Sequence, residues 1–146
     1  MNAEKENVFS VSGKLSREVL YAASLNDLLL SYCDKNIEVI YKAKDILRNI
    51  NDYFELNISN IKSAKLNNIR GRDFIGFNIS SNIETLYNTV FKTKIEIDKK
   101  KFNNAYVYYF NGSTFVYVPS RLKDKTVEFE TKHLGDFIIL NRPLDY

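Results

Sequence analysis

The sequence is poor in the residues that most often build reactive or cross-linked sites. Cys33 is the only cysteine, so neither an intrachain disulfide nor a cysteine metal cluster can form. A lone cysteine in an apolar segment is usually a small inert core residue, and we expect that role here. His133 is the only histidine, and no His, Cys or paired acidic residues accompany it at metal-ligand spacing. We therefore expect no metal and no cofactor.

Proline, glycine and long hydrophobic runs are also scarce. Two Pro and five Gly argue against a linker-like or fibrous chain. No stretch approaches the roughly 18 to 20 apolar residues of a membrane span, and the N-terminus lacks a basic-then-apolar signal pattern. These features are compatible with a cytoplasmic protein and equally with a domain taken from a longer secreted chain.

Catalytic and nucleotide-binding motifs are missing as well. The sequence has no P-loop, no GxGxxG, no GxSxG and no EF-hand spacing. The net charge of +3 is mild and does not favour nucleic acid, for which a concentrated basic face is expected. We therefore predict a protein that is not an enzyme.

What the chain does contain is typical of a single β-rich domain over residues 1–146. The hydrophobic fraction is 45%, and ten Tyr and ten Phe supply nearly all the aromatic content. Aromatic rings pack well on a pleated surface, so these residues favour strands. We expect residues 1–7, which are polar, to form a disordered tail.

The C-terminal stretch Thr126–Leu140, TVEFETKHLGDFIIL, gives the clearest local pattern. Val127, Phe129 and Thr131 alternate with polar residues, which indicates a half-buried strand. The apolar run that ends at Leu140 indicates a strand covered on both faces. Gly135 lies between them, so we expect two strands joined at a bend.

The remaining pattern predicts an antiparallel, Ig-like β-sandwich over residues 28–140, with about nine strands at intervals of roughly ten residues. One helix is expected over Arg17–Leu25, with Ser16 as its N-cap and Leu15 and Leu20 as a hydrophobic staple. Strand patterns lie near 28–33, 37–43, 54–58, 75–79, 91–98, 105–118, 126–131 and 137–140, with weaker candidates at 8–11 and 64–69. Segments 44–52 and 121–125 are interpreted as a loop and a turn.

The segment Ala105–Val118 predicts a hairpin. Asn111-Gly112 is the preferred two-residue loop of a type I′ turn, which would pair Phe110 with Ser113 and Tyr108 with Phe115. Tyr106, Tyr108, Phe115 and Tyr117 then share one side of the hairpin and Tyr109 lies on the other. The shared side suits core packing or, if exposed, a platform on which sugar rings stack.

Basic and aromatic residues suggest a second kind of candidate site. Aromatic stacking and positive charge act together on nucleic acid and acidic glycans, although lysines on strand faces are usually solvated and protect sheet edges. The candidate binding residues are Tyr109, Tyr41, Lys42, Lys44, Arg70 and Arg72. His133 has no nucleophile motif nearby, so we interpret His133 and Gly135 as a structural corner.

Three stretches, AYVYYFN, TFVYVPS and VEFETKHLGDFIIL, occur in that order in Ala105–Leu140. They resemble the closing segment of β-sandwich modules in secreted and surface proteins of Gram-positive bacteria, clostridia especially, which end on a VxFxTxHxSxY/F pattern. IEVIYKAKDI and DYFELNI are loosely similar to the early strands of those modules. The resemblance implies a non-catalytic adhesion, scaffold or wall-associated domain at the bacterial surface.

His133-Leu134-Gly135 is also similar to the His-Leu-Thr/Ser cleavage site of autoproteolytic sandwich domains. In those domains a hydroxyl attacks the preceding carbonyl. Gly135 stands at the nucleophile position and has no hydroxyl, so the acyl shift cannot start. The resemblance therefore implies a domain that keeps the corner and has lost, or never had, the cleavage.

Two hypotheses from different classes follow. The first is a non-enzymatic extracellular or cell-surface module that binds protein or cell-wall glycan or acts as a spacer. The second is an intracellular interaction domain with a basic face, whose binding to anionic partners would weaken steeply with salt.

Overall fold

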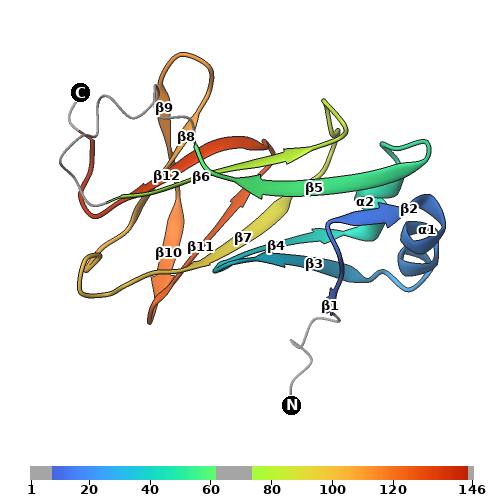
Figure 1. Cartoon of the computed structure of the whole chain (residues 1–146), viewed down its shortest axis with the longest axis horizontal. Coiled ribbons are helices and arrows are strands. Elements are labelled where there is room, and N and C mark those ends of the chain that lie inside the picture. Colours follow the sequence, from blue (N-terminus) through green and yellow to red (C-terminus); the bar gives the residue numbers. More distant parts are fainter. Residues whose placement is uncertain (1–7, 62–73, 145–146) are drawn as a thin grey trace.

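The computed structural model describes residues 8–61 and 74–144 and contains two β-sheets that pack face to face (Figure 1). The first sheet has the order β1 (Val8–Ser10), β3 (Leu29–Asp34), β4 (Ile37–Lys42), β7 (Phe91–Glu96), β11 (Thr126–Thr131) and β10 (Ser120–Lys123). The second has the order β2 (Lys14–Ser16), β5 (Tyr53–Ser59), β6 (Phe74–Ser81), β12 (Gly135–Leu140), β8 (Tyr106–Phe110) and β9 (Phe115–Val118). The prediction of a mainly β, sandwich-like protein is confirmed.

The main hydrophobic core lies between the two sheets. Rings from opposite sheets meet there, with Tyr41 against Phe54 at 5.5 Å between centroids and Phe129 against Phe137 at 5.3 Å. The chain passes from the first sheet to the second between β11 and β12, at the corner that contains Gly135. Burial of such rings from water is the dominant favourable term in holding two sheets together.

The closing stretch folds as the pattern predicts. Val127, Phe129 and Thr131 of β11 are buried, while the residues between them are not. The run that ends β12, from Phe137 to Leu140, is fully buried because the main core covers one face and the cluster with Tyr108 and Phe115 covers the other. A central strand covered on both faces requires such a continuous apolar run.

The strand count and the Ig-like type differ from the prediction. The described residues form twelve strands in two sheets of six, against about nine expected. β1 also pairs in parallel with β3, in register Val8 to Leu29, so the first sheet is mixed. Three-residue strands such as β1 and β2 leave too short a pattern for alternation to reveal.

Helix α1 (Arg17–Leu25) is confirmed with its predicted cap. The Val19 N–H donates to the Ser16 side chain at 3.3 Å, and Leu15 and Leu20 are both buried. A short second helix, α2 (Ala43–Leu47), replaces the loop expected at its position. Ala43 and Ile46 are completely buried in the core, so tertiary packing stabilises a helix too short to form alone.

The β8–β9 hairpin forms, but its predicted register is wrong by two residues. Phe110 pairs with Phe115 and Tyr108 with Tyr117. The Asn111 side-chain carbonyl accepts hydrogen bonds from the N–H groups of Ser113 and Thr114, both at 3.0 Å, and so stabilises a longer loop. A shift of two residues preserves the faces, which is why the predicted sides of the hairpin are right.

Two smaller expectations were also wrong. The segment expected as a turn over 121–125 is largely strand β10, and the turn is confined to Asp124-Lys125, where Asp124 has φ of 55°. Cys33 is exposed on the outer face of β3, with its sulfur 3.7 Å from the Ser31 hydroxyl oxygen. Tyr32 takes the inward position instead.

The expected strand near 64–69 and the expected tail over 1–7 lie outside the described residues.

Candidate functional site

The corner between β11 and β12 is built around Thr131 and His133. The Thr131 hydroxyl accepts a hydrogen bond from the His133 N–H at 3.0 Å and donates one to the His133 carbonyl at 2.9 Å. Gly135 then adopts φ of 149°, a conformation that residues with a side chain rarely take. The backbone is therefore fixed where the chain changes sheet, and the His133 side chain lies exposed beside it.

Tyr109 supports the corner from the neighbouring strand β8. Its ring stacks on the His133 imidazole with 5.5 Å between centroids and 18° between planes. Its hydroxyl donates to the Leu134 carbonyl at 3.5 Å, and its ring carbon Cε1 would lie 3.1 Å from a Cβ placed on Gly135. The sequence predicted Tyr109 and the corner separately, and the structure brings them together.

A polar network attaches the facing loop, residues 82–90, to the rest of the molecule. The Asn49 side chain donates to the Tyr87 carbonyl at 3.1 Å and accepts from the Tyr87 N–H at 2.9 Å. Asn82 bridges to β5 in the same way, donating to the Tyr53 carbonyl and accepting from the Glu55 N–H. The loop is therefore held in one position, although most of its residues are not buried.

A cleft of about 580 Å³ lies between this loop and the corner. Its aromatic lining consists of Tyr87, Tyr109, Phe91 and His133. Amide and hydroxyl side chains, among them Asn78, Ser80, Thr85 and Asn88, also line it, together with the charged Glu84 and Lys132 and several aliphatic residues. Tyr87 is 69% exposed, so one ring of the cleft is available for contact with a ligand. Concave sites that combine apolar rings with a few polar groups are typical of small-molecule binding.

The chemistry of the cleft favours binding. Among the described residues, no side chain forms a hydrogen bond with the His133 imidazole, so no base–nucleophile pair is assembled. The described part of the chain also contains no cluster of three or more His, Cys, Asp or Glu arranged to hold a metal. The lining side chains offer stacking and hydrogen bonding, and Glu84 and Lys132 add one charge of each sign.

Of the other predicted binding residues, the three that the structure describes, Tyr41, Lys42 and Lys44, do not line this cleft. Tyr41 is 2% exposed within the core, and burial raises the pKa of its hydroxyl. Lys42 and Lys44 are exposed at the end of β4 and on α2. Arg70 and Arg72 lie outside the described residues. Tyr41 is therefore unavailable for stacking on a ligand.

The outer face of the first sheet carries alternating charge. Glu38, Lys94, Glu128 and Arg121 lie directly opposite one another on four adjacent strands. Lys92 also pairs with Glu128 at 3.3 Å. Opposite charges in register stabilise a sheet face and neutralise it. The described residues of this face therefore do not concentrate positive charge.

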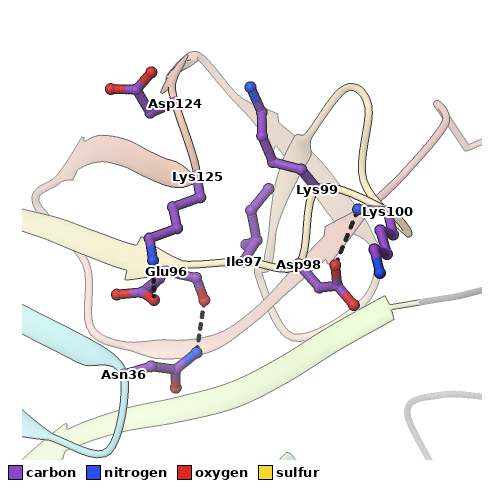
Figure 2. A pocket seen from close by; sticks show the side chains of 8 residues that line it. All are labelled: Asn36, Glu96, Ile97, Asp98, Lys99, Lys100, Asp124 and Lys125. Carbon is purple, nitrogen blue, oxygen red and sulfur yellow. Dashed lines mark hydrogen bonds and ion pairs between the residues drawn. The ribbon is translucent and has the colours of Figure 1, made fainter.

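A second, larger hollow of about 830 Å³ lies where β7, the β3–β4 turn and the β10–β11 turn meet (Figure 2). Three lysines and three acidic residues line it, and Lys125 pairs with Glu96 at 3.1 Å. The Asn36 amide donates to the Glu96 carbonyl at 2.7 Å, and the Asp98 carboxylate accepts from the Lys100 N–H at 2.9 Å. Figure 2 shows the Lys99 and Lys100 side chains pointing in different directions. Its charges are largely matched and it has no aromatic ring, so the smaller cleft is the better candidate.

Comparison with known proteins adds no relative. No protein-family model, no curated protein and no solved structure matches this chain. Neither described helix is long and apolar enough to cross a membrane. The arguments about function therefore depend on the geometry of the cleft and on the resemblance of the closing motif.

Sequence reasoning missed the loop side of the cleft. Tyr87 and Asn49 carry no motif, and the loop 82–90 has neither strand nor helix periodicity. The only local signal is the density of Asn, Ser and Thr, whose side chains bind nearby backbone groups in loops. That signal indicates an ordered loop but not which residues it faces.

Proposed function

We propose that the protein is a non-catalytic β-sandwich module that binds a saccharide in the cleft beside the β11–β12 corner. The observation that carries this proposal is the exposed Tyr87 ring in a cleft that also contains the stacked Tyr109–His133 pair. Sugar rings present apolar C–H surfaces that stack on aromatic faces. Their hydroxyls need the amide and hydroxyl partners that Asn78, Ser80 and Asn88 supply.

The fixed geometry of the loop supports binding of this kind. Immobilising side chains and loops costs roughly 0.5–1.5 kcal/mol for each flexible group at the moment of binding. Asn49 and Asn82 already hold the loop through backbone hydrogen bonds, so much of that cost is absent. A rigid cleft is useful to a module that binds a neutral ligand through stacking and hydrogen bonds.

The composition of the corner supports a non-catalytic role. The Leu134 carbonyl is the one an acyl shift would attack, and Gly135 after it has no hydroxyl. The carbonyl instead accepts a hydrogen bond from Tyr109. We infer that the corner positions the cleft.

We further propose that the module works at a bacterial cell surface or outside the cell. The support is the resemblance of VEFETKHLGDFIIL to the closing motif of modules in secreted and surface proteins of Gram-positive bacteria. Two of the motif positions, Thr131 and His133, form the hydrogen-bonded corner. On this proposal the natural ligand is a cell-wall or host glycan.

The test is a binding screen against neutral oligosaccharides, peptidoglycan fragments and teichoic acid at 50 mM and 500 mM salt. We expect a neutral saccharide to bind at both salt concentrations. We expect Tyr87→Ala to weaken that binding at least tenfold, because a stacking ring is lost. Tyr21→Ala is the matched control, since Tyr21 is also exposed, on α1, and does not line this cleft.

Other outcomes would contradict the proposal. Binding only to anionic polymers at low salt would support the basic-face alternative that includes Lys42 and Lys44. Equal loss in Tyr87→Ala and Tyr21→Ala would place the ligand elsewhere. No binding in the millimolar range to any member of the screen would leave a protein-binding or spacer role.

A further inference from the structure

The edge strand β9 is the feature of the fold that the proposed cleft does not explain. Its sequence, Phe-Val-Tyr-Val, carries no charge, and β9 is the last strand of its sheet within the described residues. Val116 is 44% exposed and Tyr117 is 52% exposed, on opposite faces of the strand. Uncharged, exposed edges are places where another strand adds to a sheet.

Residues of β9 alternate between those whose backbone groups hydrogen-bond to β8 and those whose backbone groups point away from it. The Asn111 N–H donates to the Thr114 carbonyl at 3.0 Å, and hydrogen-bonded pairs alternate from that pair along an antiparallel ladder. Val116 and Val118 therefore bond to β8, whereas the N–H and C=O of Tyr117 point away from it. Within residues 8–61 and 74–144, no hydrogen bond to these two groups is formed.

The other three edge strands are protected in ways that β9 is not. β10 presents two exposed cations, Arg121 and Lys123, of which Arg121 lies opposite Glu128 of β11 and Lys123 lies opposite the uncharged Thr126. β2 is three residues long and runs directly into α1, and β1 is three residues long. Short strands and charged side chains are the usual means by which proteins block edge pairing. β9 is the longest described edge strand that lacks a charge.

The position of β10 decides which partner suits β9. Pro119 alone separates the two strands, and the ribbon of β10 continues from that of β9 in Figure 1. Arg121 and Lys123 therefore follow β9 directly along the chain. A second copy paired antiparallel about Tyr117 would place Ser113 opposite Arg121 and Asn111 opposite Lys123, so it would offer these cations no opposite charge. An extended peptide with acidic residues at one end would meet the same cations with opposite charge.

We propose that β9 is a docking edge for an extended peptide strand, apolar at alternate positions and acidic at the end that lies beside β10. The peptide would pair through the Tyr117 N–H and C=O and cover the Tyr117 ring. Antiparallel pairing is slightly the more stable arrangement. It places the acidic residues at the N-terminal end of the peptide, because β9 runs toward β10.

The test uses the full chain, labelled with ¹⁵N, and two capped peptides, Glu-Glu-Val-Thr-Val-Thr-Val and Lys-Lys-Val-Thr-Val-Thr-Val. We expect the acidic peptide to bind at least fivefold more tightly at 50 mM salt and to shift the amide signals of β9. The difference should shrink at 500 mM salt, since exposed charges are screened. Arg121→Glu should remove or reverse the preference.

Tyr117→Pro tests the backbone contact. Proline removes the outward N–H, and proline is tolerated on an edge strand at such a position. We expect this variant to keep its fold and to bind the acidic peptide at least tenfold more weakly, whereas Tyr117→Thr keeps the N–H and retains more of the affinity. If Tyr117→Pro does not fold, hydrogen exchange of wild type decides: the Tyr117 amide must slow at least tenfold when the peptide is added.

Three results would overturn the proposal. The first is binding of the acidic peptide that Tyr117→Pro leaves unchanged. The second is no shift of β9 signals at millimolar peptide. The third is concentration-dependent dimerisation of the protein alone that Tyr117→Pro abolishes, which would assign the edge to a second copy.

Discussion

Thr93 is a fully buried residue of β7 whose hydroxyl forms no hydrogen bond within the described part of the chain. An unpaired buried hydroxyl costs roughly 1–3 kcal/mol in protein mutational data. Valine has the same shape without the hydroxyl and suits a strand equally well. We expect Thr93→Val to raise the free energy of unfolding by about 1 kcal/mol, measured by urea denaturation.

Thr89 provides a matched control for this prediction. It is equally buried, but its hydroxyl donates to the Tyr87 carbonyl at 3.0 Å. Thr89→Val leaves that carbonyl with one partner fewer and should lower the free energy of unfolding by about 1 kcal/mol. Equal effects of the two substitutions would contradict the assignment of Thr93 as unpaired.

Tyr41 predicts how the protein responds to alkaline pH. Burial raises the pKa of its hydroxyl above that of the unfolded chain, so the folded protein keeps the proton longer. The stabilisation is complete below the unfolded pKa of about 10 and is lost as the pH rises toward the folded pKa. We expect Tyr41→Phe to flatten the fall of stability above pH about 10, followed by urea denaturation at several pH values.

Tyr21→Phe is the control for this experiment because the Tyr21 ring is exposed on α1. A fall of stability above pH about 10 that persists unchanged in Tyr41→Phe would mean that another group causes it. At neutral pH the two substitutions should each change the free energy of unfolding by less than about 1 kcal/mol.

The corner between β11 and β12 belongs to the scale of elements, since it joins the two sheets. Gly135 has φ of 149°, and a Cβ there would lie 3.1 Å from the Tyr109 ring. Backbone strain of this kind costs roughly 1–3 kcal/mol. We expect Gly135→Ser to lower the free energy of unfolding by about 2 kcal/mol, and intact-mass spectrometry to detect no cleavage.

Gly112→Ser tests how much of the stability lost in Gly135→Ser comes from contact with Tyr109 and how much from the backbone conformation. Gly112 also has positive φ, at 105°, but an added Cβ would meet nothing within 4 Å. Its substitution should therefore cost less than that of Gly135. Equal costs would mean that contact with Tyr109 contributes nothing, and cleavage of Gly135→Ser would show that the corner can support an acyl shift.

The elements that were predictable from sequence share one property. β11, β12 and α1 are six to nine residues long, and each has a complete local signal: alternation, a continuous apolar run, or a capped amphipathic helix. α2 and β10 lack such a signal, because α2 depends on the burial of Ala43 and Ile46 and β10 on its pairing with β11. Tertiary contacts decide these short elements.

The candidate site was predictable only on one side. Tyr109 and the His133–Gly135 corner follow from strand patterns and the glycine, but their contact follows from the neighbouring positions of β8 and β12 in the sheet. Tyr87 enters the cleft through hydrogen bonds with Asn49, 38 residues away in sequence. No local pattern in the sequence indicates a contact between residues so far apart along the chain.

At the scale of the whole molecule, the two sheets present different outer faces. The first carries opposite charges in register, whereas the second carries a separate apolar cluster around Tyr108, Phe115, Ile138 and Leu140. The Leu144 N–H donates to the Tyr108 hydroxyl at 3.0 Å, so the C-terminal segment covers part of that cluster. The corner cleft is lined by strand ends and by the loops that join them, and we expect its ligand to contact both.

The most direct test of the central claim is to locate the bound saccharide by ¹⁵N chemical-shift mapping of the full chain with the best neutral ligand from the screen. The account predicts saturable shifts at residues 84–89 and 132–135, with β9 and α1 unchanged. Saturable shifts confined to residues outside the cleft would contradict it.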